Sequence, residues 1–119
     1  MTPWQVEGVE VSRGYGVEKI SCTVPADEYD QVVAVLGTVR ESVCTRQYPE
    51  EAGDRNETNM AFFTDGKLWL FQCRENGYVS LTFEDAKTGA VYGCEGKLLY
   101  IHSEALWNYI MDTVNTKAK

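Results

Sequence analysis

Histidine and cysteine are the residues here that could most readily supply a catalytic base or a nucleophile. The chain has a single histidine, His102, which is followed directly by Ser103. A nucleophile and its base must meet at hydrogen-bonding distance in a defined orientation, and adjacency in the sequence does not provide this. A Cys–His dyad would have to combine His102 with one of four cysteines, and no local sequence favours any of them. We therefore expect no enzymatic activity and assign no catalytic residue.

The four cysteines have neither the spacing of a zinc ribbon nor that of a redox motif, because no two form a CxxC pair. Their even number permits two disulfides in an oxidising compartment, and three connectivities are then open. Alternatively, all four are thiols that act as small hydrophobic side chains. The sequence does not decide how the cysteines pair; they are Cys22, Cys44, Cys73 and Cys94.

The segment Tyr48–Asn59 is rich in acids but lacks the alternating oxygen ligands of a calcium loop. We expect it to be a solvated, mobile loop. Glycines stand singly at turns, so no phosphate-binding loop is indicated, and we expect no metal and no cofactor. Asn56-Glu57-Thr58 matches a glycosylation acceptor, a tripeptide that is common by chance. The acids are Glu50, Glu51, Asp54 and Glu57.

Charge and length narrow the class of protein further. The 119 residues carry a formal net charge of −7, which argues against a nucleic-acid binder, since that would need a clustered basic face. No stretch is apolar over the length of a membrane span. The N-terminus lacks the pattern of a signal peptide, although Met1 could be a start that replaces a removed leader. We expect one domain over residues 1–119, with residues 1–3 and 115–119 frayed.

Two segments have the spacing of amphipathic helices. Pro25 suits the first turn of one helix, which Gly37 would end. Ser103 can cap a second helix at the C-terminus. The apolar stripes are Tyr29, Val32, Val33 and Leu36 in the first helix, and Leu106, Trp107, Ile110, Met111 and Val114 in the second.

The remaining apolar runs predict strands. Val17–Val24 alternates as a strand, Arg40–Gln47 suggests a short one, and Ala90–Cys94 and Lys97–Ile101 flank a turn. With the strands described next, this predicts the α+β class. We expect an antiparallel sheet of about five or six strands with two helices, one after an N-terminal strand and one C-terminal.

Two tight-turn signals, Asp65-Gly66 and Asn76-Gly77, join three apolar strands. Both dipeptides favour type I′ hairpins, so the first predicts Phe62 opposite Trp69 and the second predicts Gln72 opposite Leu81. Side chains alternate along a strand, so both faces of the sheet carry apolar residues. We take as the core face Ala61, Phe63, Leu68, Leu70, Val79, Leu81 and Phe83. The second face then carries Met60, Phe62, Trp69, Phe71, Cys73 and Tyr78, followed by Ser80 and Thr82.

The aromatic cluster on this second face has two interpretations. If a helix covers that face, these residues are core. If both helices pack on the other face, the cluster is an exposed patch of the kind that marks protein contacts, with Trp69 and Phe71 as anchors. A homodimer through this face is a further alternative. The candidate binding residues are Met60, Phe62, Trp69, Phe71 and Tyr78.

The hairpin pattern and aromatic rhythm of MAFFTDGKLWLFQCRENGYVSL and GAVYGCEGKLLY, with a short closing helix, support one resemblance. Residues 17–114 resemble small uncharacterised α+β domains of Gram-positive gut bacteria, many of which follow a lipoprotein or secretion leader. This resemblance implies an extracytoplasmic location, and it supplies no catalytic residues.

Two functions from different classes follow. The first is a non-catalytic, protein-binding domain of a bacterial envelope or secreted protein. The second is a small acidic cytoplasmic inhibitor, of the toxin-immunity or phage anti-defence type, which blocks a basic site on a target protein. Paired cysteines and an upstream leader would favour the first, and reduced thiols would favour the second.

Overall fold

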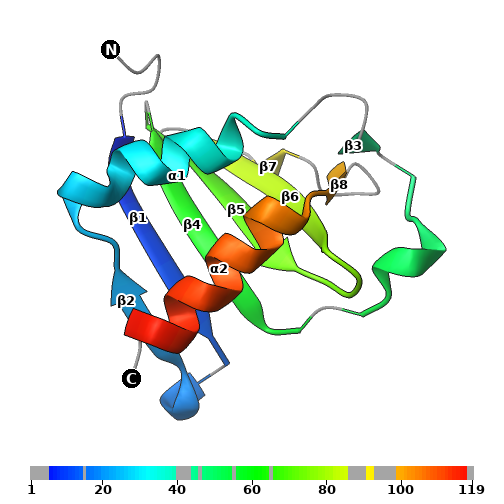
Figure 1. The fold of residues 1–119 in the computed structure, drawn as a ribbon, viewed down its shortest axis with the longest axis horizontal. Coiled ribbons are helices and arrows are strands. Elements are labelled where there is room, and N and C mark those ends of the chain that lie inside the picture. Colours follow the sequence, from blue (N-terminus) through cyan, green and yellow to red (C-terminus); the bar gives the residue numbers. More distant parts are fainter. Residues whose placement is uncertain are drawn as a thin grey trace.

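The computed structural model describes residues 6–14, 16–39, 44–45, 47–54, 56–64, 66–85, 91–92 and 99–117 of the chain. These residues form an antiparallel sheet with two α-helices on one face (Figure 1). The α+β class predicted from the sequence is therefore confirmed. Predictions that fall on Asp65, Arg40–Val43, Glu95-Gly96, residues 1–5 or residues 118–119 lie outside the described residues.

The strands follow one another in the sheet in the order β2-β1-β4-β5-β6-β8-β3, and β7 pairs with β6. Six of these strands have four residues or more, and two have only two residues. They are β1 (Val6–Arg13), β2 (Ile20–Thr23), β3 (Cys44–Thr45), β4 (Thr58–Thr64), β5 (Lys67–Cys73), β6 (Tyr78–Asp85), β7 (Val91–Tyr92) and β8 (Leu99–His102).

The helices form where the apolar stripes predict them. Helix α1 (Tyr29–Leu36) follows a 3-10 turn, η2 (Ala26–Glu28), and helix α2 (Glu104–Lys117) closes the chain. Ser103 caps α2 as predicted, since its Oγ accepts a hydrogen bond of 3.2 Å from the Leu106 N–H. Helix α2 extends to Lys117, so residues 115–117 are helical rather than frayed as expected. The Asn115 Oδ1 accepts a hydrogen bond of 2.8 Å from Arg13 Nη1.

The β4–β5 hairpin has the register that its turn predicts. Thr64 lies opposite Lys67, Phe62 opposite Trp69 and Met60 opposite Phe71. The loop is therefore two residues long, and Gly66 has a φ of 71°, the left-handed conformation that a type I′ turn requires. Turn chemistry alone is sufficient to fix this pair of strands.

The register predicted for β5 and β6 is wrong by one residue. Leu81 lies opposite Phe71 rather than Gln72. The turn itself forms as expected, because Asn76 and Gly77 have φ values of 57° and 76° and the Tyr78 N–H donates to the Glu75 carbonyl oxygen. However, the Arg74 N–H donates to the Tyr78 carbonyl oxygen, so two residues oppose Tyr78. This β-bulge reverses the faces of β6 relative to β5.

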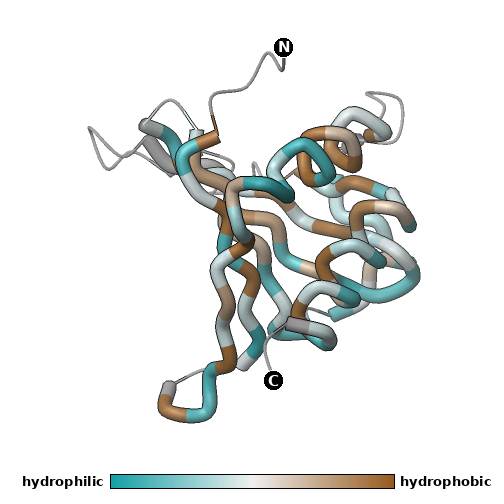
Figure 2. The backbone as a smooth tube through the Cα atoms, turned by 60° about the vertical axis from the view of Figure 1, so that its left-hand side comes forward, coloured by the Kyte–Doolittle hydropathy of each residue, from teal (hydrophilic) through white to brown (hydrophobic). Residues whose placement is uncertain are grey.

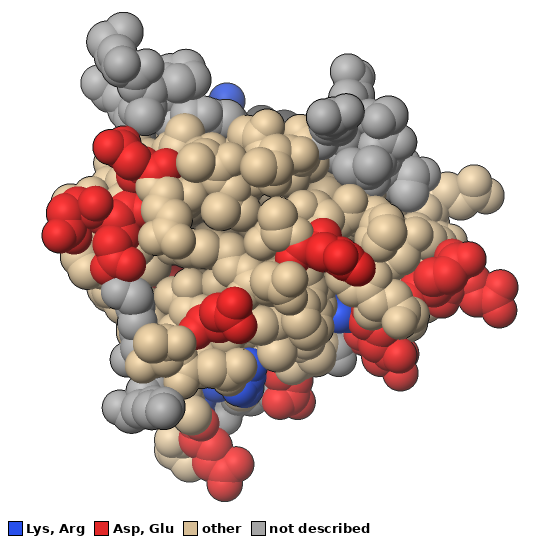
Figure 3. Space-filling view, in the orientation of Figure 1, with Lys and Arg blue, Asp and Glu red and all other residues tan. Residues whose placement is uncertain are grey.

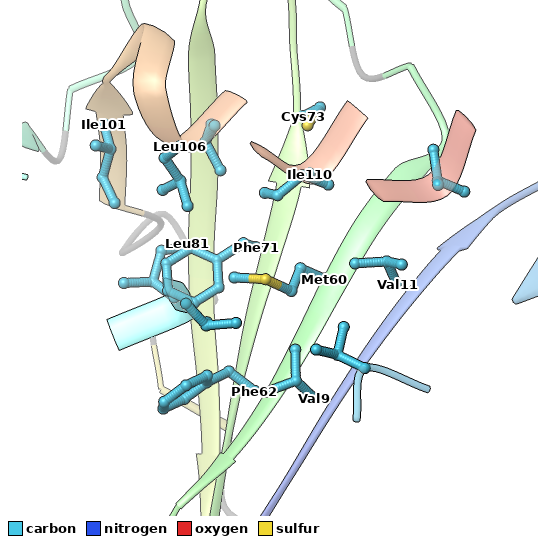
Figure 4. Close-up of a cluster of buried hydrophobic side chains, with 14 residues drawn as sticks. Val9, Val11, Met60, Phe62, Phe71, Cys73, Leu81, Ile101, Leu106 and Ile110 are labelled. Atoms are coloured by element: carbon cyan, nitrogen blue, oxygen red, sulfur yellow. The ribbon is translucent and has the colours of Figure 1, made fainter. Parts of the chain in front are cut away.

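Because of the bulge, the apolar side chains of β6 lie on the same side as those of the second face defined above. This side is the core, and the predicted core face is therefore wrong. Both helices pack there, where Met60 and Phe62 are 0% exposed and Phe71 is 2% exposed (Figure 4). Burying each large apolar side chain stabilises the fold by about 1.5–3 kcal/mol. The core consists of Val9, Val11, Val24, Val32, Met60, Phe62, Phe71, Cys73, Val79, Leu81, Ile101, Leu106, Ile110 and Val114.

The opposite face of the sheet is not covered by either helix. Figure 2 shows the helical coils on one side of the strands. We call the other side the open face. Its central positions, read from the strand register, are Gly8, Glu10 and Ser12 of β1, Asn59, Ala61 and Phe63 of β4, Leu68, Leu70 and Gln72 of β5, and Ser80 and Thr82 of β6.

Candidate functional site

The five candidate binding residues do not form one surface. Met60, Phe62 and Phe71 lie in the core beneath the helices, as in the first of the two interpretations of this cluster. Trp69 is half-buried at the edge of that core, with its ring centroid 6.5 Å from that of Phe71. Tyr78 is half-buried on the other face and stacks on His102, with a centroid distance of 4.5 Å. A partner could reach only Trp69 and Tyr78 of this set directly.

The open face carries an apolar patch at its centre, formed by Ala61, Phe63, Leu68 and Leu70. Phe63 and Leu70 are 40% and 37% exposed, although both belong to central strands. Leu70 lies opposite Ala61 and Phe63 opposite Leu68, so the four side chains are contiguous. The Phe63 ring lies over Gly8, where an added Cβ would be 3.5 Å from Phe63 Cδ2. We call these four residues the open-face patch.

A hollow of about 380 Å³ adjoins this patch. It shares Ala61 and Leu70 with the patch and is otherwise lined by polar and charged side chains, including Glu10 and Lys19. An apolar centre with a polar rim that holds both signs of charge has the composition of a protein-binding surface. The remaining lining residues are Ser12, Asn59 and Gln72.

One corner of the open face is covered by the chain itself. Tyr100 of β8 lies there, with its ring centroid 5.5 Å from that of Tyr48 in an edge-to-face arrangement. The Arg74 guanidinium lies 5.4 Å and 5.5 Å from the centroids of these two rings. This cation–π contact fixes the segment that contains Tyr48 against the sheet. The open-face patch lies outside this covered corner.

The acidic segment around η4 (Glu50–Ala52) is held by hydrogen bonds, in contrast to the mobile loop that we expected. The Glu75 carboxylate accepts a bond of 2.7 Å from the Asp54 N–H, and the Glu75 N–H donates to the Ala52 carbonyl oxygen at 2.9 Å. Arg74 Nη2 donates to the Gly53 carbonyl oxygen. These contacts join η4 to the bulge between β5 and β6, and so stabilise the register of β6.

The helix-bearing side of the molecule has a different character, because acidic side chains are scattered over it and basic ones are few (Figure 3). A groove of about 390 Å³ runs between α1 and α2. Glu28 and Asp112 line it together with polar and apolar side chains. This side would repel an acidic surface and attract a basic one.

Cys73 is a free thiol in the core, so two disulfides do not form among the four cysteines. Burial raises the pKa of the Cys73 thiol to about 12, and the positive charge of Arg13 opposes this only in part. Cys73 points into the core, whereas His102 is paired with Tyr78 on the other face. Cys22 lies on β2, five strand positions from β8 and thus about 24 Å away. Neither of these two cysteines can form a dyad with His102.

The glycosylation acceptor is folded into the protein. Thr58 is 0% exposed, and its Oγ1 accepts a hydrogen bond of 3.0 Å from Arg13 Nε. The Asn56 amide nitrogen lies 3.6 Å from the Met111 sulfur. The folded chain therefore does not present this tripeptide to an enzyme.

Neither metal ligation nor membrane insertion has support in the part of the chain that the structure describes. No group of three or more histidine, cysteine or carboxylate side chains in that part could hold a metal ion. Within the same residues, neither helix has the length and apolarity needed to cross a bilayer.

No protein-family model, curated protein or solved structure matches this chain. The arrangement of its own residues must therefore support any functional conclusion.

Sequence reasoning assigned the open-face patch to the core. In the observed register of β6, this face continues into Gln72, Ser80 and Thr82. Such a run of polar residues is typical of a solvated face. The missing information was the bulge.

Proposed function

We propose that this chain is a non-catalytic protein-binding domain that contacts its partner through the open-face patch. The observation that carries the proposal is the exposure of Phe63 and Leu70, side by side on central strands, on a face that neither helix covers. Apolar residues at the centre of an antiparallel sheet are normally covered, and a contiguous exposed group of them commonly marks a contact with another protein.

The rim of this surface supports the same function. Glu10 and Lys19 stand beside Leu70 around the adjoining hollow, so a partner could pair opposite charges with them while it buries the apolar centre. Such rim charges contribute to specificity and to the rate of association more than to affinity. Phe63 and Leu70 would be the anchors, and truncating an anchor typically weakens binding by about 2 kcal/mol, or roughly thirtyfold.

A matched pair of charge substitutions tests the proposal. Leu70→Lys places a charge in the open-face patch, whereas Val17→Lys makes the same change at a fully exposed apolar residue outside it. Proteins retained by the wild-type chain would be compared with those retained by each variant. Each candidate partner would then be purified and its affinity measured by calorimetry. We expect Leu70→Lys to weaken binding by about thirtyfold or more and Val17→Lys to leave it within about twofold.

Equal affinity for the two variants would refute the proposal. The comparison is valid when Leu70→Lys has the circular dichroism spectrum of the Val17→Lys protein and unfolds in urea in a single cooperative transition. A second copy of this chain is one partner to test, and sedimentation of the wild type and of Leu70→Lys would reveal a dimer through this face.

A second function is favoured by the acidic helix-bearing side. A small inhibitor that blocks a basic site would use the surface around the α1–α2 groove, where Glu28 and Asp112 lie. The free, buried Cys73 also fits a reducing compartment better than it fits a secreted domain in which all four cysteines are paired. Binding of this kind would weaken steeply with salt and would be lost in Asp112→Lys but not in Leu70→Lys. The surface that the partner uses would therefore discriminate between the two functions, and with them between the envelope and the cytoplasm.

A further inference from the structure

A second candidate site lies on the helix-bearing side of the sheet, away from the open-face patch. It is a pocket of about 200 Å³ between the C-terminal end of α1 and strand β8. Its described lining is entirely apolar, and two of its residues, Trp69 and Phe71, are candidates from the sequence. The lining consists of Leu36, Val39, Trp69, Phe71, Leu81, Leu99 and Ile101.

The pocket arises from the way in which the chain leaves α1. The helix ends at Leu36, and the Val39 N–H donates to the Leu36 carbonyl oxygen at 3.2 Å, which turns Val39 over the sheet. Phe71, Leu81 and Ile101 form the floor of the pocket and are between 2% and 6% exposed. The half-buried residues Leu36, Val39, Trp69 and Leu99 form the upper wall.

The size of the pocket suits a small ligand. The pocket opens to the surface on one side and holds about 200 Å³, several times the volume of one water molecule. An engineered apolar cavity of about 150 Å³ stays dry and binds benzene. The present pocket is slightly larger than that cavity and smaller than pockets that hold drug-sized molecules, which start at about 300 Å³.

The lining also defines the chemistry of the occupant. No charged or hydrogen-bonding group is contributed by the described lining residues other than the Trp69 ring nitrogen. A charged ligand would lose its hydration there without compensation, and water needs two or more polar partners to be stable in such a space. We propose that this pocket binds a small uncharged apolar molecule about the size of one aromatic ring.

Toluene is a suitable probe, and methyl groups that line the pocket provide the readout. In a methyl-labelled sample we expect saturable shifts and intermolecular NOEs at Leu36, Val39, Leu81, Leu99 and Ile101. The methyl groups of Val9 and Val11, which lie in the core on β1, should not show NOEs to toluene. A rise in the melting temperature with toluene concentration would accompany binding.

A filled pocket provides the control. Val39→Phe adds a ring at the rim of the pocket and should weaken toluene binding by about tenfold or more, because the added ring occupies the space of the probe. Val17→Phe adds the same ring at a fully exposed position and should leave the affinity unchanged. Leu99→Phe fills the pocket from β8 and is the second variant should Val39→Phe not fold.

Two results would overturn the proposal. One is a wild-type protein whose methyl shifts increase linearly with toluene without saturation, or spread equally to Val9 and Val11. The other is undiminished, saturable binding by a folded pocket-filling variant. Neither result bears on the open-face patch, because none of these substitutions alters it.

Discussion

Leu70 and Phe71 are neighbours on β5 whose side chains point to opposite faces of the sheet, and truncating each to alanine tests which face is the core. Phe71 is 2% exposed and packs beneath the helices, so Phe71→Ala removes buried contacts and leaves a cavity. Substitutions of this kind cost about 3–5 kcal/mol. That is a large part of the roughly 5–15 kcal/mol by which native domains are stable.

Leu70→Ala should cost much less. Leucine exceeds alanine by three carbon atoms, which are worth about 2.4 kcal/mol if fully buried, at about 0.8 kcal/mol each. Leu70 is 37% exposed on a face that solvent can refill, so about 1.5 kcal/mol or less is expected. The lower strand propensity of alanine affects both variants and cancels in the comparison.

Urea denaturation provides the assay. With a slope of about 1–3 kcal/mol/M, a difference of about 2–3 kcal/mol separates the two midpoints by about 0.7–3 M. Equal midpoints, or a lower midpoint for Leu70→Ala, would refute the assignment of the faces. The proposal for the open-face patch would then fail as well, because it requires Leu70 to be exposed.

Three further predictions concern single residues. Burial raises the pKa of Cys73 to about 12, so between about pH 8.5 and pH 12 the folded state keeps a proton that the unfolded chain loses. The free energy of unfolding should therefore fall as the pH rises through this range, and it should fall less in Cys73→Ala. Ser103→Ala removes the cap of α2 and should lower the free energy of unfolding by about 1 kcal/mol in urea titrations, whereas a change below about 0.3 kcal/mol would mean that the cap bond is not formed. Gly53 has a φ of 55°, and an added Cβ would collide with the Glu75 carboxylate. Gly53→Ala should therefore cost about 1–3 kcal/mol in thermal or urea unfolding, and an unchanged midpoint would contradict the η4 contacts.

Local signals predicted those parts of the fold that local interactions determine. The β4–β5 register follows from a dipeptide turn, and the cap at Ser103 follows from a side chain three residues from its partner. The stripes of α1 and α2 face the core because apolar residues recur at helical spacing. Each of these features can be read within one short window of sequence.

The β5–β6 register could not be read in this way. Asn76-Gly77 specifies the type of turn, but it does not specify whether a flanking residue bulges. The contacts that hold Arg74 and Glu75 come from Gly53 and Asp54, twenty-one residues earlier in the chain. A one-residue shift then exchanges every side chain of β6 between the two faces. The choice of core face depended on this long-range interaction.

The bulge also determines where both candidate sites lie. In the observed register, Leu81 joins Phe71 on the wall of the pocket, while Thr82 lies opposite Leu70 on the open face. Strand β5 therefore contributes Trp69 and Phe71 to one site and Leu68 and Leu70 to the other, with only the thickness of the sheet between them. Because side chains alternate, Leu70→Lys should weaken a protein partner without altering toluene binding, and Val39→Phe should do the reverse. If toluene changed the affinity for a protein partner, the two sites would be coupled across the sheet, and the same factor would appear in the effect of the partner on toluene binding.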